Sequence, residues 1–171
     1  MKKLFIAAIT LTCLTACVRP IPELPAETQT GAKTFGCLVN GELVIPYYEN
    51  SLASSYDYNP HAVYDRIEDR LRITGYGQNY QFFEFTVNLP ENGLSAPIDK
   101  VRYFPPNSNG DYYYGGENIG NIILTRFDLT QRIVSGTFNF TGYKHDANTE
   151  ELIDSNDFVM VTLGRFDIRM N

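Results

Sequence analysis

The sequence is poor in the residues from which metal centres and catalytic triads are usually built. Its 171 residues include three cysteines, two histidines and no tryptophan. A zinc site needs three or four histidine or cysteine ligands, so His61, His145 and one domain cysteine would need added carboxylates. A triad needs a base beside a nucleophile, and no serine stands in a nucleophile-elbow pattern. These scarcities argue against zinc, against triad catalysis and against a resident cofactor.

Positive charge is also scarce. The chain has 14 lysines and arginines against 20 aspartates and glutamates, which gives a formal net charge of −6. A balance of this sign opposes binding to phosphate backbones or to anionic lipid surfaces through bulk charge. We therefore expect no nucleic-acid partner.

The N-terminus has the pattern of an export signal. Lys2 and Lys3 precede the uncharged run LFIAAITLTCLTA, which has the length of a signal-peptide core and is too short to span a bilayer. The run ends in Leu14-Thr15-Ala16-Cys17, which resembles the bacterial lipobox. The resemblance implies that residues 1–16 are removed and that Cys17 carries a diacylglyceryl group and an N-terminal acyl chain such as palmitate. The alternative is an ordinary secreted protein that is cut at a small-residue site.

Lipidation of Cys17 has consequences for the other cysteines and for the charge. Cys13 leaves with the signal, so Cys37 is the one remaining thiol and no internal disulfide forms. Loss of Lys2 and Lys3 leaves 12 basic against 20 acidic residues, a net charge of −8. Each buried methylene contributes about 0.8 kcal/mol, so two or more acyl chains hold a protein stably on a membrane.

A proline-rich segment follows the lipidated cysteine. Pro20, Pro22 and Pro25 lie in VRPIPELPAETQTGAK, which has no apolar periodicity. This composition favours extended backbone, so we predict a flexible tether over residues 17–33. From residue 34 to residue 171 the composition is that of a folded domain, with aromatic and β-branched runs broken by glycine, asparagine and proline.

The domain reads as β-strands almost throughout. Asn40-Gly41 separates two apolar runs, as in a type I′ hairpin, and alternation places Cys37 among buried residues. Alternation also marks residues 70–74 and 82–89, and two long strands follow that are joined by a turn near residues 129–131. In the last segment the apolar positions change phase near Gly164, which predicts a β-bulge. Only residues 148–153 have the composition of a helical turn. We expect one antiparallel β-sandwich or partly closed β-barrel.

Several segments together resemble a known group of proteins. These are the lipobox, the proline-rich segment, FGCLVNGELVIP, LRITG, IVSGTFNFTGY and GRFDI. The chain resembles small lipoproteins of Bacteroidetes that are classified as a domain of unknown function. The resemblance covers nearly the whole mature chain and implies an outer-membrane lipoprotein, on either the periplasmic or the surface side. It supplies no catalytic residues.

Tyrosines supply the strongest suggestion of a ligand site. Tyr112, Tyr113 and Tyr114 are consecutive and lie between Gly110 and Gly115. Consecutive residues of a strand face opposite sides, so at least one of these tyrosines should be exposed. Exposed tyrosines can stack on sugars and hydrogen-bond their hydroxyls, which suggests binding of a glycan or a small apolar molecule. The alternative is that these rings cover a sheet edge, and the absence of tryptophan favours it.

Acidic residues offer two weaker hypotheses. Residues 146–157 carry oxygen ligands that echo a calcium loop, but Glu151 stands where that loop needs glycine, so a solvated acidic loop is the alternative. Asp111 and Glu117 could serve a carboxylate-dependent hydrolase if they faced one cleft. The leading hypothesis is a non-enzymatic, lipid-anchored binding or interaction module of the cell envelope, with a glycan or a protein as partner.

Overall fold

A computed structural model describes residues 23–45, 58–89, 94–106, 108, 112–116, 119–146 and 149–171. The signal peptide, Cys17 and residues 18–22 lie outside this range. Among the described residues no helix is long and apolar enough to cross a membrane. The strands are β1 (Thr34–Val39), β2 (Glu42–Val44), β3 (His61–Asp65), β4 (Arg70–Tyr76), β5 (Phe82–Asn88), β6 (Ser95–Pro97), β7 (Lys100–Phe104), β8 (Tyr112–Gly115), β9 (Gly120–Asp128), β10 (Ile133–His145) and β11 (Leu152–Arg169). One short 3-10 helix, η1, covers Gln78–Tyr80.

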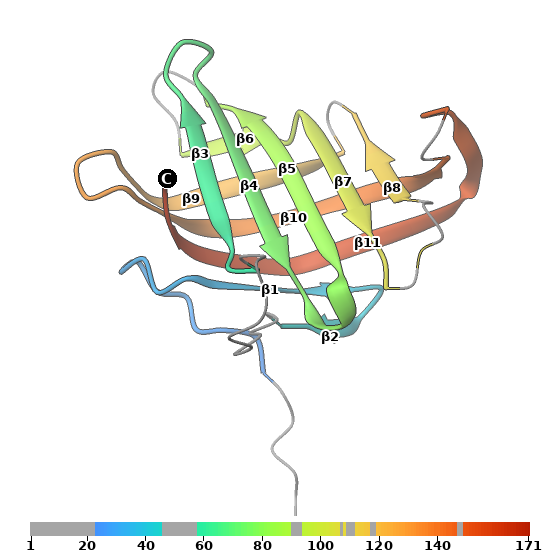
Figure 1. Cartoon of the computed structure of the whole chain (residues 1–171), viewed down its shortest axis with the longest axis horizontal. Helices are drawn as coiled ribbons and strands as arrows, with labels where there is room; N and C mark the ends of the chain where they lie inside the picture. The colour runs from blue at the N-terminus through green and yellow to red at the C-terminus, as the bar shows by residue number, and fades with distance from the viewer. Residues whose placement is uncertain are drawn as a thin grey trace, which may run out of the picture.

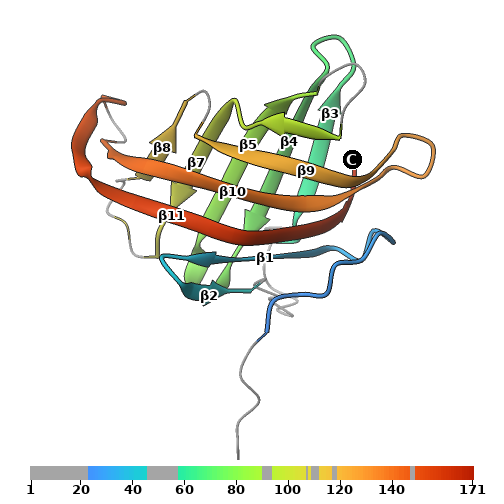
Figure 2. The ribbon, with the colours of Figure 1, turned by 180° about the vertical axis from the view of Figure 1, so that it is seen from behind.

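The strands form a single antiparallel sheet that folds over onto itself. The main order is β2-β1-β11-β10-β8-β7-β5-β4-β3, and β9 also pairs with β10 and carries β6 on its other side. Figure 1 shows β3, β4, β5, β7 and β8 as a front layer that crosses the long strands behind it. Figure 2 shows the back layer of β9, β10, β11, β1 and β2. The long strand β10 joins the layers, because it pairs first with β9 and then with β8.

The sheet does not close into a complete barrel. Strands β2 and β3 are the two ends of the main order, and a single parallel bridge, Ala62 to Met170, links β3 to the C-terminus. The prediction of an all-β, antiparallel fold that is a sandwich or a partly closed barrel is therefore confirmed.

Phenylalanine rings fill the space between the layers. Phe35 of β1 lies 5.4 Å from Phe83 of β5 and 5.3 Å from Phe138 of β10, measured between ring centroids. Phe85 lies 4.7 Å from Phe138. All four rings are almost fully buried, as the alternating pattern of these strands predicts. Cys37 is also fully buried, which confirms its interpretation as a core residue.

Two local backbone predictions are confirmed. Asn40 and Gly41 have φ values of 50° and 85° and connect β1 to β2, as a type I′ turn requires. Near Gly164 the pairing with β10 moves from Phe138–Gly164 to Phe140–Val161, so β11 contains one extra residue. Leu163 lies in this irregular part of β11, where its backbone is left-handed with a φ of 51°, and it is 60 % exposed. This is the predicted β-bulge.

Two other local predictions need correction. Residues 23–33 were predicted as part of a flexible tether, but Thr28 and Gly31 donate hydrogen bonds to the buried carboxylate of Asp167. The domain therefore begins before residue 34. Residue 148 of the helical turn predicted for residues 148–153 lies outside the described residues, and among residues 149–153 the helical pattern is limited to one hydrogen bond, from the Glu150 N–H to the Asp146 carbonyl. It ends there because Glu150 is left-handed, with a φ of 58°, and because Leu152 already pairs with His145.

Candidate functional site

A row of ring side chains crosses the outer face of the sheet from β4 to β10. Strand register places Tyr76 opposite Phe82, Phe82 opposite Phe104, and Tyr112 opposite His145. The ring centroids follow one another at 5.3, 5.6, 5.1 and 6.1 Å. We call these five residues the aromatic row. Neighbouring strands lie about 4.8 Å apart, so the row extends over roughly 20 Å.

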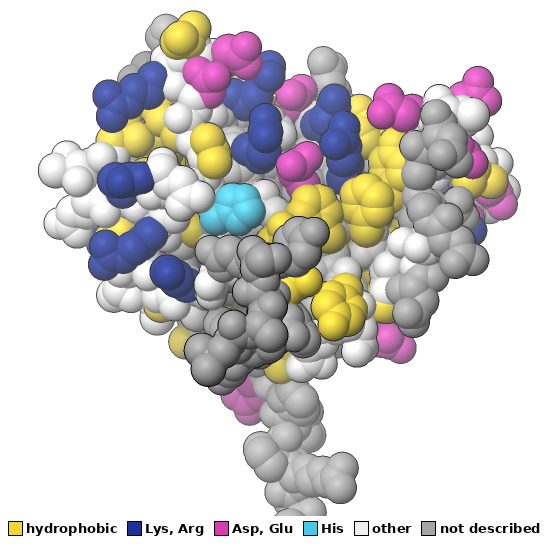
Figure 3. All heavy atoms as spheres, in the orientation of Figure 1, with side chains coloured by type: hydrophobic (Ala, Val, Ile, Leu, Met, Phe, Trp, Pro, Cys, Tyr) yellow, Lys and Arg dark blue, Asp and Glu magenta, His cyan; other side chains and the backbone are white. Residues whose placement is uncertain are grey.

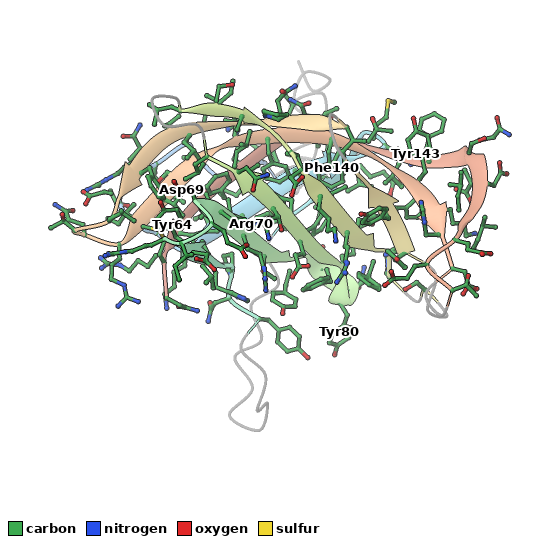
Figure 4. All side chains as sticks on the ribbon, turned by 90° about the horizontal axis from the view of Figure 1, so that it is seen from above. Tyr64, Asp69, Arg70, Tyr80, Phe140 and Tyr143 are labelled. Atoms are coloured by element: carbon green, nitrogen blue, oxygen red, sulfur yellow. The ribbon has the colours of Figure 1, made fainter. Side chains whose placement is uncertain are left out.

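Further tyrosines extend the aromatic row at its β4 end. Tyr58, which precedes β3, lies edge-on to Tyr76 at 5.5 Å and to Tyr80 at 6.0 Å. Tyr80 belongs to η1 and is 62 % exposed, and Figure 4 shows it pointing away from the front layer. Figure 3 shows hydrophobic side chains gathered over the lower part of the front layer. The outer face of the front layer therefore exposes apolar ring surface to solvent.

A row of polar groups runs parallel to the aromatic row and is displaced from it by two residues along each strand. Glu84 of β5 lies opposite Arg102 of β7, and their charged groups approach to 3.7 Å. Arg102 in turn lies opposite Tyr114 of β8. The Lys100 ammonium lies 5.9 Å from the centre of the Tyr114 ring, in a cation–π contact. The outer face thus places ring edges and faces beside a carboxylate, a guanidinium and an ammonium.

A shallow open hollow lies where the aromatic row reaches β10. Its volume is about 550 Å³, and its walls include Tyr114, Ile119, Tyr143, His145 and Leu152. Tyr143 lies opposite Tyr114 in the pairing of β10 with β8 and is 37 % exposed. Figure 4 shows Tyr143 on the outer side of the back layer, whereas Phe140 lies between the layers. The hollow therefore lies on the same outer surface as the aromatic row, at the point where the front layer joins the back layer.

The three predicted tyrosines take different positions. Tyr112 is only 6 % exposed and belongs to the aromatic row. Tyr114 is half-buried and borders the hollow. Tyr113, also half-buried, faces the opposite side and donates a hydrogen bond of 2.9 Å to Asp157. The alternation is as predicted, but the most exposed ring of the region is Tyr80, not one of these three.

Asp157 is held by two partners. Besides Tyr113, the Lys144 ammonium lies 3.2 Å from its carboxylate. The hydrogen bonds from Tyr113 and Lys144 lower the pKa of Asp157 below its ordinary value. Asp157 lies within β11, whereas Asp146 accepts a hydrogen bond from the Thr149 N–H in the preceding turn. Among the residues of 146–157 that the structure describes, no group of three or more acidic or histidine side chains could hold a metal ion.

The remaining sequence hypotheses concern histidines and acids. His61 Nδ1 lies 3.4 Å from the Asn59 carbonyl oxygen, and His145 Nδ1 lies 3.0 Å from that of Glu150. Asp111 and Glu117, the residues of the hydrolase hypothesis, lie outside the described residues. Within the described ranges no group of three or more His, Cys, Asp and Glu could hold a metal ion.

The aromatic row does not follow from the sequence alone. Its members are terminal residues of five different strands, β4, β5, β7, β8 and β10, so only the strand order brings them together. One signal was present: Phe82 stands on the polar face of its strand with Glu84, Thr86 and Asn88. An aromatic residue on an otherwise polar face indicates a ring on the outer surface of the sheet.

Comparisons with protein-family models, with curated proteins and with solved structures gave no match.

Proposed function

We propose that this protein is a non-enzymatic, lipid-anchored binding module of the cell envelope and that the aromatic row is its ligand-binding face. The anchoring half of the proposal is supported by the lipobox that ends at Cys17. The binding half is supported by one observation above all, the unbroken row of rings across five strands.

The geometry of the rings suits a preorganised surface. Tyr76, Phe82 and Phe104 meet at interplanar angles of 59° and 62°, whereas Phe104 and Tyr112 are nearly parallel at 15°. Each ring is held by its neighbours on adjacent strands, so little side-chain freedom is lost when a ligand binds. Rigid aromatic side chains with few rotatable bonds give contact area at low entropic cost.

The neighbouring polar groups favour a carbohydrate chain as the ligand. Apolar ring surfaces contact the C–H faces of sugars, and Glu84 can accept hydrogen bonds from hydroxyls while Arg102 donates them. A linear glycan is long enough to lie along the row and end in the hollow beside Tyr114. The same face carries two more cations, Lys100 and the exposed Arg72, in the row of residues beyond Glu84 and Arg102. These cations would also accommodate acidic sugars.

Binding to a panel of soluble polysaccharides, neutral and acidic, tests the proposal. Phe82→Ala and Tyr114→Ala remove rings from the face, and each should weaken binding about tenfold, which corresponds to ~1.4 kcal/mol. Ile67→Ala is the matched control, because Ile67 is 96 % exposed in the turn between β3 and β4. Absence of binding to every polysaccharide, or equal binding by all three variants, would contradict the proposal.

A further inference from the structure

A second pocket lies on the other side of the sheet, at the mouth between the β1–β2 hairpin and the front layer. Its volume is about 360 Å³. The aliphatic part of its wall comprises Val39, Leu43, Val44, Pro105, Pro106 and Val159. This volume falls within the range of small-molecule sites, and the mouths of β-barrels are common places for them. We call it the mouth pocket.

Two polar side chains of the mouth pocket are placed to bind a ligand, and one of them has a buried atom without a hydrogen-bond partner. The Gln81 side chain lines the pocket, and its Oε1 atom is buried with no partner. The Tyr103 side chain also lines the pocket, so its hydroxyl is a second polar group that a ligand there could contact. A buried polar group without a partner costs about 1–3 kcal/mol, so the Gln81 Oε1 atom indicates a place that a donor group of a ligand fills.

The two groups differ in the partner they require. Gln81 Oε1 is an acceptor and needs an N–H or O–H donor. Burial raises the pKa of Tyr103 well above its ordinary value, and Cys37, Tyr113 and Glu42 raise it further, so the hydroxyl stays protonated and can donate. The carboxylate of Glu42 also lines the pocket and opposes an anionic ligand.

We propose that the mouth pocket binds an uncharged, mainly apolar small molecule that offers one hydrogen-bond donor to Gln81 Oε1 and one acceptor to the Tyr103 hydroxyl. This site is independent of the aromatic row. Tyr103 and Tyr113 point inward from β7 and β8, whereas Phe104, Tyr112 and Tyr114 point outward from the same strands.

Two neutral fluorescent naphthalene derivatives test the two proposed hydrogen bonds one at a time. N-phenylnaphthylamine is neutral and carries a single N–H donor, whereas propionyl-dimethylaminonaphthalene is neutral and carries a carbonyl acceptor. Both should bind the full mature protein saturably with enhanced fluorescence. Anilinonaphthalenesulfonate adds a sulfonate to the first skeleton and should bind at least tenfold more weakly because of Glu42.

Substitutions then assign each bond. Gln81→Leu should weaken the N–H probe about three- to tenfold and leave the carbonyl probe unchanged. Tyr103→Phe, which keeps the ring contact with Phe83 at 4.6 Å, should do the reverse. Gln78→Leu, at an exposed position of η1, is the control for the glutamine change. Gln81→Leu removes an unpaired buried oxygen, so it should fold at least as well as the parent protein.

A bulky substitution locates the bound probes. Leu43→Trp fills the mouth pocket and should abolish binding of both, whereas Tyr114→Ala in the aromatic face should leave both unchanged. Loss of binding with Tyr114→Ala but not with Leu43→Trp would overturn the proposal, as would the absence of saturable binding or an equal effect of each variant on both probes. None of these outcomes depends on glycan binding, so the two proposals fail separately.

Discussion

Asp167 of β11 lies directly opposite Ser135 of β10, and its carboxylate accepts a hydrogen bond of 2.6 Å from the Ser135 hydroxyl. Asp167 is only 1 % exposed. The same carboxylate accepts hydrogen bonds from the N-terminal segment, at Thr28, Thr30, Gly31 and Ala32. One buried charge therefore ties the segment before β1 to the two longest strands of the sheet.

The first prediction concerns the pH dependence of this connection. Burial alone would raise the pKa of Asp167, but hydrogen bonds from Ser135, Thr28 and backbone N–H groups outweigh it and hold the pKa well below the ordinary value of about 3.9. Because the pKa is lower in the folded state, this carboxylate stabilises the protein above about pH 4. That contribution is lost as the pH falls from about 4 through the lower folded-state value.

Urea unfolding of the Asp167→Asn variant measures this contribution. At pH 7 we expect the variant to have a free energy of unfolding lower by about 3 kcal/mol, because an amide nitrogen faces N–H donors that need an acceptor. At pH 3 the difference from the parent protein should be smaller. Asp154→Asn, at an exposed position, is the control and should change stability by less than about 0.5 kcal/mol at either pH. A difference that grows on acidification would contradict the assignment.

Local features of the fold could be predicted from the sequence because their causes are local. The Asn40-Gly41 turn depends on two residues that tolerate positive φ. The bulge near Gly164 shows as a phase change within one strand. The burial of Phe83, Phe85 and Cys37 follows from alternation along single strands.

Features that depend on distant pairing could not be predicted in this way. The segment around Gly31 looked flexible because its partner, Asp167, lies 136 residues away. The aromatic row requires the neighbour relations of β4, β5, β7, β8 and β10, which one sequence does not reveal. The mouth pocket likewise depends on where the β1–β2 hairpin meets β7.

The second prediction concerns the close approach of Gly75 to Phe35, which brings the two layers together. A Cβ atom added to Gly75 would lie 2.6 Å from three carbons of the Phe35 ring. Gly75→Ala should therefore lower the free energy of unfolding by about 2–3 kcal/mol through overpacking, as measured by urea unfolding. Gly116→Ala is the matched control, because nothing lies within 4 Å of a Cβ there. Equal stability of the two variants would show that the layers separate easily at this point.

The third prediction concerns the thiol of Cys37. Burial raises its pKa to about 12, so at pH 8 it is a protonated thiol that a thiol-reactive reagent cannot reach. We expect labelling of the native protein to be at least about 100-fold slower than labelling in urea, because it requires opening of the fold. A Ser95→Cys variant in a Cys37→Ala background provides an exposed thiol as control. Rapid labelling of native Cys37 would show that β1 opens readily.

The last prediction concerns the membrane anchor. In the native host, the parent protein should incorporate radiolabelled palmitate and sediment with membranes, because two or more acyl chains give stable attachment. Cys17→Ala removes the thiol that the lipid requires, so the label should be absent and the chain should be released or remain as an uncleaved precursor. Cys13→Ala changes the other cysteine of the same segment, which is discarded with the signal, and should leave labelling and sedimentation unchanged. Normal palmitate incorporation by the Cys17→Ala protein would rule out this lipobox, and an equal loss in both variants would place the defect in export instead of lipid transfer.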